Sequence, residues 1–391
     1  MTRRRRSSPD RFADAQADWR APEAIDDALL GRWQALADSA SEPNIFYEPA
    51  LLMPAIRHCR GDDDLTLFLL WEGAPDKSAL IGMMPVSRSW RYRRWPFLHV
   101  ANWKYANAFL GSPLVAPGAE QAFWAALIEA VQRRFWGGFL HIQGLPLDGP
   151  LAKGLRKAGY ATGRRHDVVQ VRPRAFILAE GRDADSYYRN AVRSKKRKEL
   201  RRQRARLEEL GTLTEHRWSD EEGLERWIEE FLALEAAGWK GGAGTALGSA
   251  SGSAAFFREA MTGAAARGQL LRQGLRLDGR PIAMLVTLRS GEGAFSFKTA
   301  FDEALARYSP GVQLQLMNLQ NLGDPTLAWI DSCAAQDHPM IDHIWRERRP
   351  IGGVSIALCW RGRRLYFSAV RTAETWQQRL KQMRSKKGSS R

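Results

Sequence analysis

The segment from Tyr308 to Gly311 combines the features of a helix start that could hold an anion. Ser309 can cap the helix with its hydroxyl, Pro310 fits the first turn because its missing N–H costs nothing there, and Gly311 allows close approach to the backbone. The first amides of a helix lack partners and carry about half a positive charge. A phosphate is therefore a natural ligand of this turn, although the same sequence also starts many helices that bind nothing.

The run 193–206 is a second group with ligand chemistry, since nine basic side chains stand against Glu199. Clusters of Lys and Arg neutralise phosphates and bind them in a salt-dependent way, so the run could hold a nucleic acid or another anionic surface. No aromatic residue is interleaved after Tyr188, and a solvated helix is the commoner explanation of such a run. Contact with tRNA and simple solvation both stay open.

The cysteines Cys59, Cys333 and Cys359 are far apart in the chain. None belongs to a CxxC pattern, and no HxxxH pattern accompanies them, so the spacing typical of a zinc site is missing. We expect reduced structural thiols and no bound metal.

The net charge of +16 is concentrated in three short segments. Residues 193–206 carry +8, residues 1–12 carry +4 and residues 379–391 carry +6, which leaves −2 for the rest. A protein that grips a duplex with a whole face would spread its charge over the fold. We expect a nearly neutral folded body with basic tails at 1–20 and 371–391.

Neither a membrane span nor an export signal is expected. No apolar run reaches the roughly 20 residues that cross a bilayer, and the stretch from Ile282 to Leu288 is only strand-sized. The N-terminus opens with Arg3 to Arg6, but the polar stretch that follows lacks the apolar core of a secretory or twin-arginine signal. We therefore expect a cytoplasmic protein.

Hydrophobic periodicity predicts an α/β chain in which one order of elements occurs twice. The first half is expected to contain, in order, a helix at 22–39, a hairpin of strands 65–71 and 80–86, a strand at 106–115, a helix from Pro117-Gly118 to about Trp136, a strand at 139–143, a helix at 150–158 and a strand at 166–171. The second half is expected to contain a hairpin of strands 270–277 and 281–288 around Asp278-Gly279, a strand at 294–301, a helix from Ser309-Pro310-Gly311 to Leu322, a strand at 327–331, a helix at about 338–345 and a strand at 354–360. This repeated order favours a structural duplication of two domains.

Between the two halves, the pattern predicts the basic helix and two more helices, at 221–237 and 253–266. The segment 238–252 is rich in Gly, Ser and Ala, which is typical of a mobile loop.

Three segments of the second half resemble a known family. They are RKELRRQRARLEELG (197–211), GQLLRQGLRLDGRPIAMLVTL (268–288) and FSFKTAFDEALARYSPGVQLQLMNLQNL (295–322). In order and spacing they resemble the GNAT-like acetyltransferase domain of the CelD/BcsL group, bacterial proteins associated with cellulose and exopolysaccharide synthesis and related to Fem-type peptidoglycan transferases. The resemblance covers roughly residues 185–345.

The resemblance implies an α/β protein with two tandem GNAT-like folds, each a mixed sheet flanked by helices. The N-terminal domain would span 21–175 and the acetyltransferase domain 176–370. In this fold two parallel strands splay apart, the pantetheine arm of acyl-CoA fills the gap, and its pyrophosphate rests on the next helix start. The acyl-CoA site, with acetyl-CoA as the expected co-substrate, would comprise Ser309, Gly311, Val312 and Gln313. Its counterpart at Pro117 lacks the serine, so we expect one site.

The implied reaction is attack of an amine on the thioester carbonyl, and an ammonium of pKa near 10 must first lose its proton. The candidates for the base are Glu235, Asp302, Asp331 and His343. Asp302 and Asp331 end neighbouring strands and could both lie at the open end of the splayed sheet, although such residues are more often caps or turns.

Three further residues are candidates for contact with the acceptor. Trp239 and Lys240 flank the glycine-rich segment and would line the acceptor pocket, or lie exposed at its edge. Lys298 lies within the strand at 294–301, where it would pair with a phosphate or carboxylate of a ligand, or form an internal salt bridge.

Three functions remain open. The leading hypothesis is an acyl-CoA-dependent N-acyltransferase that acts on an amine of a cell-surface polysaccharide precursor or a similar small acceptor. A Fem-like transferase that uses aminoacyl-tRNA, held by the basic helix 193–206, is the first alternative. The second is a catalytically silent scaffold in polysaccharide synthesis, because the chain reads Asp337 to Trp345 where the family closes with a tyrosine-lysine pair.

Overall fold

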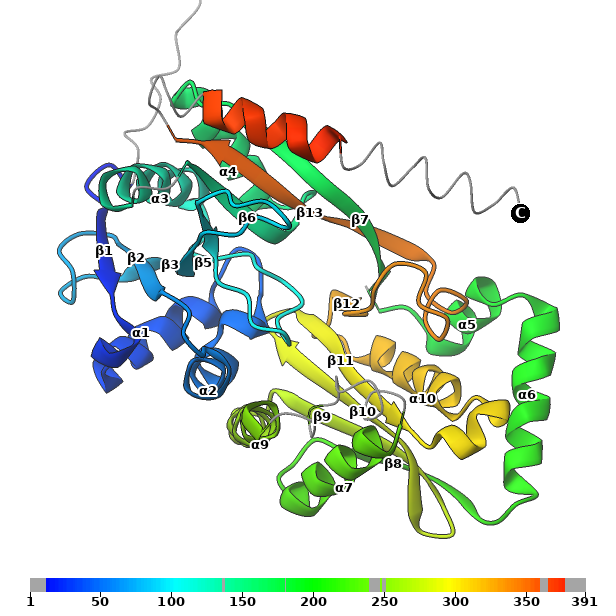
Figure 1. Cartoon of the computed structure of the whole chain (residues 1–391). Coiled ribbons are helices and arrows are strands. Elements are labelled where there is room, and N and C mark those ends of the chain that lie inside the picture. Colours follow the sequence, from blue (N-terminus) through cyan, green and yellow to red (C-terminus); the bar gives the residue numbers. More distant parts are fainter. Residues whose placement is uncertain are drawn as a thin grey trace, which may run out of the picture.

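One 13-stranded sheet runs through the protein, of which a computed structural model describes residues 12–135, 138–179, 181–238, 247, 251–358 and 365–376 (Figure 1). The strands are β1 (Gln16–Arg20), β2 (Leu65–Trp71), β3 (Leu80–Ser89), β4 (His99–Asn102), β5 (Leu114–Val115), β6 (Phe139–Pro146), β7 (His166–Leu178), β8 (Leu213–Trp218), β9 (Leu270–Leu277), β10 (Arg280–Ser290), β11 (Gly293–Phe301), β12 (Trp329–Asp331) and β13 (Glu347–Ala357). Their order is β1-β2-β3-β4-β6-β13-β7-β12-β11-β10-β9-β8, with β5 beside β3.

Helices cover both faces of this sheet. The α-helices are α1 (Asp27–Asp38), α2 (Pro49–Cys59), α3 (Glu120–Arg134), α4 (Pro150–Ala161), α5 (Ala184–Ala191), α6 (Ser194–Glu208), α7 (Leu224–Ala237), α9 (Ser251–Ala266) and α10 (Pro310–Asn318). Short 3-10 helices are η1 (Pro22–Ala24), η2 (Ile45–Tyr47), η4 (Glu303–Tyr308) and η5 (Leu319–Gly323), and a further helix occupies residues 365–376.

The two halves share their central strands. β13 comes from the second half of the chain, yet it pairs antiparallel with β6 and with β7 of the first half. The last residues of β7 pair in turn with β12. A single sheet therefore joins the two units, and the expected domain boundary at 175/176 falls inside β7. The domain limits themselves stay a prediction.

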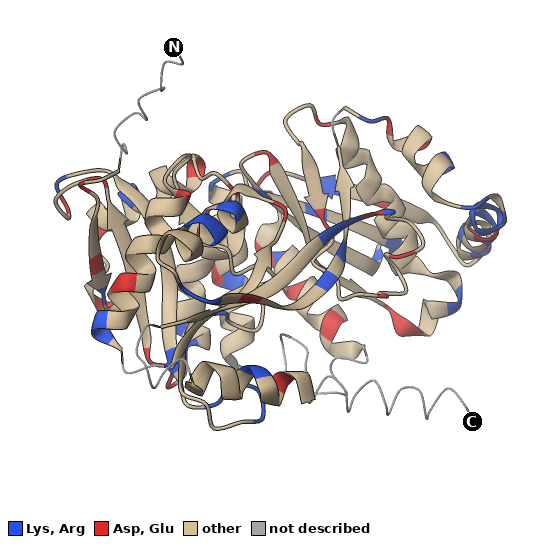
Figure 2. Ribbon diagram, turned by 90° about the horizontal axis from the view of Figure 1, so that it is seen from above, with Lys and Arg blue, Asp and Glu red and all other residues tan. Residues whose placement is uncertain are grey.

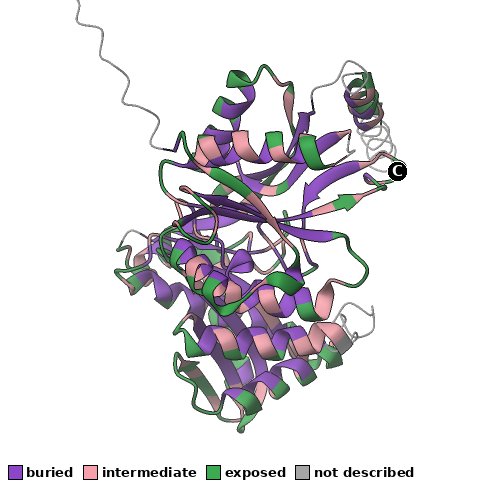
Figure 3. Ribbon diagram, turned by 90° about the vertical axis from the view of Figure 1, so that its left-hand side faces the viewer, coloured by how far each residue is buried: buried purple, intermediate pink, exposed green. Residues whose placement is uncertain are grey.

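Each half has its own pair of covering layers (Figure 1). In the first half α1 and α2 lie on one side of the strands and α3 and α4 on the other, and in the second half α7 and α9 lie opposite α10 (Figure 1). Strands such as β2 and β10 are largely buried, whereas the outer helix faces and much of β7 are exposed (Figure 3). The halves meet where α2 packs against α9, with Tyr105 edge-on to Phe256 at 5.3 Å between ring centroids. His58 also bonds Glu259 across this contact at 2.7 Å.

Most helices and strands that were predicted from the spacing of apolar residues are confirmed, including both hairpins and the basic helix, which is α6. The predictions missed β1, α2, β4, α5, β8 and the helix at 365–376. Two prolines mask α2 in the sequence, because Pro49 lies in its first turn, where proline is tolerated, and Pro54 lies inside the helix.

Two predicted elements are wrong. Residues 338–345 form successive turns instead of a helix, with Asp337 in the left-handed region (φ 61°) and Pro339 close behind it. Their apolar side chains Ile341 and Ile344 are nevertheless buried in the core beneath α5. The strand expected at 106–115 shrinks to β5, because most of this segment is a loop that follows β4. The predicted loop 238–252 lies largely outside the described residues.

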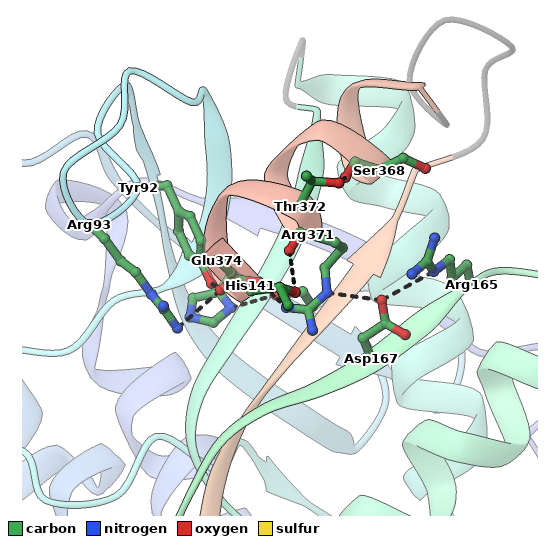
Figure 4. Close-up of polar contacts among 11 residues, drawn as sticks. Tyr92, Arg93, His141, Arg165, Asp167, Ser368, Arg371, Thr372 and Glu374 are labelled. Carbon is green, nitrogen blue, oxygen red and sulfur yellow. Dashed lines mark hydrogen bonds and ion pairs between the residues drawn. The ribbon is translucent and has the colours of Figure 1, made fainter. Parts of the chain in front are cut away.

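The helix 365–376 docks on the first half through a buried acidic residue (Figure 4). Glu374 is 2% exposed and accepts a 2.5 Å hydrogen bond from the Tyr92 hydroxyl. Arg93 and Arg371 also pair with its carboxylate. Asp167 on β7 forms an ion pair with Arg371, with 3.1 Å between Oδ2 and Nε, so the helix is also tied to β7. The predicted tail at 371–391 therefore begins within an ordered helix.

Candidate functional site

The start of α10 differs from the expected helix cap. Ser309 has left-handed backbone angles (φ 55°, ψ 49°) and its side chain makes no capping hydrogen bond, so the predicted hydroxyl cap is wrong. A capping hydroxyl normally sits on an extended residue. Instead, the Ser309 carbonyl accepts from the amides of Val312 and Gln313, both at 3.0 Å. Of the backbone amides of Gly311, Val312 and Gln313, the last two therefore already have a partner within the helix.

The chain itself covers this helix start. Gly311 is buried, and a Cβ added to it would lie 2.7 Å from the Met340 sulfur, which belongs to the segment 332–346. On the other side, the Gln313 side-chain amide donates to the Leu200 carbonyl of α6 at 2.9 Å. Binding of an anion at the Gly311 backbone therefore requires the Met340 side chain to move. The acyl-CoA site at Ser309, Gly311, Val312 and Gln313 stays a prediction.

The parallel strands beside this helix separate after three residue pairs. β11 and β12 pair only from Gly293–Trp329 to Phe295–Asp331. Beyond Phe295, β11 continues to Phe301 with β10 on one side and, among the described residues, no paired strand on the other. An extended, amide-bearing molecule can therefore add to this free edge, as a peptide adds to a sheet.

The equivalent gap in the first half is closed. β4 and β6 also run parallel and pair only at Val100–Leu140 and Ala101–His141. Beyond them, the Asn102 side chain bridges the strands by donating to the carbonyls of Gly111 (2.8 Å) and Gln143 (2.9 Å). Its oxygen accepts from the Gln143 amide at 2.8 Å. The loop after β4 thus occupies the space that is open beside β11.

Two predicted site residues meet on the α7 side of β11. Glu235 of α7 is 3% exposed and its carboxylate lies 3.8 Å from the Lys298 ammonium. The other Glu235 oxygen accepts from the Leu247 amide at 2.9 Å. A buried carboxylate with its counter-ion therefore stands beside the free edge, on the face opposite α10. Trp239 and Lys240 lie outside the described residues.

Asp331 ends β12 and is fully buried. One carboxylate oxygen accepts from the Cys333 amide at 2.7 Å, and the other lies 3.6 Å from Arg174 Nη1 of β7. Burial raises the pKa of the Cys333 thiol well above its ordinary value, so this cysteine stays protonated. Asp331 is in register with Phe295 of β11, which places it at the point where the two strands separate.

The remaining two candidates lie elsewhere. Asp302 accepts from the Ala304 amide at 3.0 Å, as the cap of η4, and pairs with Arg280 at 3.0 Å. His343 is exposed and lines a surface cavity at the start of α6, together with Arg193 and Lys196. The four predicted bases therefore fall at four places, of which only those of Glu235 and Asp331 adjoin the free edge of β11.

Sequence reasoning missed the residues of a cavity of about 210 Å³ that lies between the halves. Lys104, Phe109 and Gln143 line it from the first half, Arg174 from β7, and Gln336 from the segment after β12. Phe109 packs edge-on to Phe297 of β11 at 5.8 Å between ring centroids. These residues belong to loops and strand ends with no motif, so only their meeting in space marks them.

Among the described residues, no three side chains of His, Cys, Asp or Glu are arranged to hold a metal ion. Within the same residues, no helix has the length and apolar character needed to cross a membrane.

Residues 194–338, from α6 to the segment after β12, match the family model described as an acetyltransferase (GNAT) domain. No curated protein matches the chain.

Solved structures resemble the whole architecture at low sequence identity. The crystal structure of FemX is similar with a TM-score of 0.52 and 10% identity, over 83% of this chain and 95% of that one. A conserved protein of unknown function from Bacteroides thetaiotaomicron has the same TM-score of 0.52 and 10% identity, over 84% and 97%. The C-terminal domain of a putative lysylphosphatidylglycerol synthetase from Agrobacterium fabrum has a TM-score of 0.50 and 11% identity, over 87% and 94%. At such identities the likeness concerns the fold.

The predicted fold class is confirmed: the protein is α/β, with a large mixed sheet flanked by helices. The C-terminal half carries the segment that matches an acetyltransferase domain.

Proposed function

We propose that the protein is an acyl-CoA-dependent N-acyltransferase that acts on an amine of a cell-surface polysaccharide precursor or a similar small acceptor, with acetyl-CoA as donor. The observation that carries this proposal is the free edge of β11 from Ser296 to Phe301, within a segment that matches an acetyltransferase domain. The closed gap beside Asn102 favours one donor site per chain, in the C-terminal half. The resemblance to the CelD/BcsL group motivates the choice of acceptor.

In the proposed reaction, the amide-bearing arm of the donor lies along the edge of β11 and the acceptor approaches from the α7 side. The neutral amine attacks the thioester carbonyl, so that a C–N bond forms and the C–S bond breaks. The proton leaves the amine for a carboxylate, and the thiolate of the departing CoA takes up a proton. Glu235 is the carboxylate best placed for this role, because it is buried beside Lys298 on the acceptor side of the edge.

Asp331 has a positioning role in this proposal. Its two oxygens face the Cys333 amide and Arg174, so it holds the end of β12 at the separation point. Movement of the segment 332–346 from the α10 start would uncover the Gly311 amide for a phosphate.

The experiment is a calorimetric titration of acetyl-CoA into the wild type, Gly311→Glu and Val312→Glu. A glutamate at either position opposes a phosphate at the start of α10, so we expect binding by the wild type only. Gly323→Glu is the matched control, because Gly323 lies at the far end of the same helical segment in open space. Circular dichroism must show that each variant is folded. Absence of binding by the folded wild type would remove the proposal.

A Fem-like transfer from aminoacyl-tRNA is the second candidate, and one observation favours it. The start of α10 is covered by Met340, whereas α6 presents Lys195, Lys198 and Arg201 to solvent beside few acidic residues (Figure 2). Such a helix suits a phosphate backbone without sequence preference. Salt-dependent binding of charged tRNA that is lost when Lys195 to Lys198 are neutralised, together with no binding of acetyl-CoA, would favour this candidate.

A further inference from the structure

The cavity between the halves has cationic walls. Lys104 follows β4, and Arg172 and Arg174 lie on β7. Asp331 is the acid that faces Arg174 there, at 3.6 Å. His141 also lines the cavity, but burial lowers its pKa to about 3, so its imidazole adds no charge.

Lys104 lines this cavity without a counter-ion among the described residues. Its side chain is half-buried within the cavity wall, and its ammonium has no hydrogen-bond or ion-pair partner among the residues that the structure describes. Burial, and then the nearby Arg174 guanidinium, lower the pKa of Lys104 to about 8. An enclosed charge without a partner is costly unless a ligand supplies the opposite charge.

One nitrogen of the Arg174 guanidinium also lacks a hydrogen-bond partner. Its Nη2 donates to the Phe109 carbonyl at 2.9 Å, but the buried Nη1 makes no hydrogen bond. The Asp331 oxygen that faces it, Oδ2, is also buried and without a hydrogen bond. The two groups are aligned at a distance too long for a direct hydrogen bond. Arg174 is therefore ion-paired with Asp331, but the hydrogen-bonding capacity of Nη1 is not used within the protein.

We propose that this cavity binds the anionic group, a carboxylate or phosphate, of a substrate, with Lys104 and Arg174 as its counter-ions and Arg172 at its mouth. Arg172 is exposed, which suits the entry of a charged ligand. The volume of about 210 Å³ exceeds the roughly 30 Å³ share of one water molecule several-fold, so a phosphate or carboxylate with part of its substrate fits.

The position of the cavity links this site to the transfer reaction. Phe109 lines the cavity and contacts Phe297, which precedes Lys298 of the acceptor side. An amine whose anionic end is held by Lys104 would extend along this aromatic pair toward the free edge of β11. This step rests on the proposed function, and it narrows the acceptor to an amine that also carries a negative charge.

The test is thermal unfolding of the full chain in inorganic phosphate, in acetate and in chloride at equal ionic strength and pH 7. We expect phosphate or acetate to raise the Tm of the wild type above its value in chloride, by roughly 2 to 6 °C at saturation. The comparison of phosphate with acetate tells which anion the cavity prefers. The rise should be lost in Lys104→Met and in Arg172→Met, the second of which changes only an exposed side chain.

Lys153→Met is the matched control, because it removes an exposed lysine of α4 that lies outside the cavity lining. Equal Tm shifts in the wild type and in both cavity variants, or no shift in the wild type, would overturn the proposal. Since no acyl-CoA is present, failure of the anion site and failure of donor binding are seen in separate experiments.

Discussion

At the residue scale, the site is dominated by charges that the fold has removed from water. Asp331 is fully buried, its partner Arg174 is 14% exposed in its side chain, and Glu235 is buried beside Lys298. Separating such a group from its partner leaves an uncompensated charge, which costs more than the pair contributes when intact. Stability measurements on single residues can therefore reveal which pairs are complete in the free protein and which await a ligand.

Lys104→Met should stabilise the protein in the absence of a bound anion, by up to about 1 kcal/mol at pH 7, because it removes a half-buried cation without a partner. The pH dependence has a definite sign. Burial lowers the folded-state pKa of Lys104 to about 8 from 10.5, so the unfolded chain holds more protons between these values and the wild type gains stability as the pH rises through this window. The advantage of Lys104→Met should shrink over the same window.

Urea unfolding of the wild type and Lys104→Met at pH 7, 8.5 and 10 measures this difference. A variant that is less stable at pH 7, or an advantage that grows with pH, would contradict the account of an enclosed, unpaired cation.

Arg174→Leu should be destabilising by about 3 kcal/mol or more, because it leaves the Asp331 carboxylate buried without a counter-ion. The double variant Arg174→Leu/Asp331→Asn should recover part of this loss, since the second change removes the orphaned charge. Chemical denaturation of the two proteins measures the recovery. Equal stability of the single and double variants would show that the pair is not coupled.

The sequence predicted several of these residues individually but none of their partners. Glu235 and Lys298 were both candidates, yet they are 63 positions apart in the chain and their pairing depends on how α7 lies over β11. Lys104 had no motif to mark it, because its significance comes from enclosure by β7 and the segment after β12. Ser309 has the composition of a cap, but its left-handed backbone removes that role.

Among the elements, the segment 332–346 covers the start of α10. The helix start has the expected Ser-Pro-Gly sequence, but Met340 lies against Gly311 and blocks access to its backbone. Periodicity predicted a helix at 338–345, whereas the turns there place Met340 over α10 and bury Ile341 and Ile344 below. The predicted turn Ser309-Pro310-Gly311 is therefore present, but the Met340 side chain covers it.

Met340→Ala should lower the Kd for acetyl-CoA roughly 3- to 10-fold, a change of about 1 kcal/mol, because it removes the side chain that covers Gly311. Met53→Ala on α2 serves as the control, since it truncates a half-buried methionine remote from α10. Calorimetric titration of the three proteins gives the values. An unchanged or higher Kd in Met340→Ala would mean that this contact does not oppose donor binding.

The two gaps between parallel strands also show what a repeated order of elements can predict. The repeated order matched the strands expected at 106–115 and 139–143 with β11 and β12. In the structure β4 takes the first of these places, and the parallel pairs β4–β6 and β11–β12 both separate after a few residues. Whether a gap is open depends on the side chain at the point where the two strands separate. In the first half this is Asn102, which closes the gap. That distinction requires the three-dimensional packing of the loop after β4.

At the scale of the whole molecule, the shared strands β7 and β13 make the halves interdependent. β13 lies between β6 and β7, so neither half can complete its sheet without a strand from the other part of the chain. The sequence suggested two consecutive domains. Composition and periodicity carry no information on which strands pair, so they could not indicate that β13 of the second half lies between two strands of the first. The fold class was predictable from local patterns and the family resemblance, whereas this pairing was not.

Unfolding should accordingly occur in a single transition in which both halves lose structure together. Far-UV circular dichroism and the fluorescence of tryptophans, which occur buried in both halves as Trp124 and Trp345, should give coincident midpoints in urea. Two separated transitions would contradict the interdependence of the halves.

The central claim is that a donor occupies the C-terminal half, between β11 and the start of α10. Hydrogen–deuterium exchange with and without acetyl-CoA tests it most directly, because amides that bind or border the ligand become protected. We expect protection at 296–301 and 309–313, altered exchange at 332–346, and no change at 102–112, where Asn102 closes the equivalent gap. Protection confined to 102–112, or no change anywhere at saturating acetyl-CoA, would contradict it.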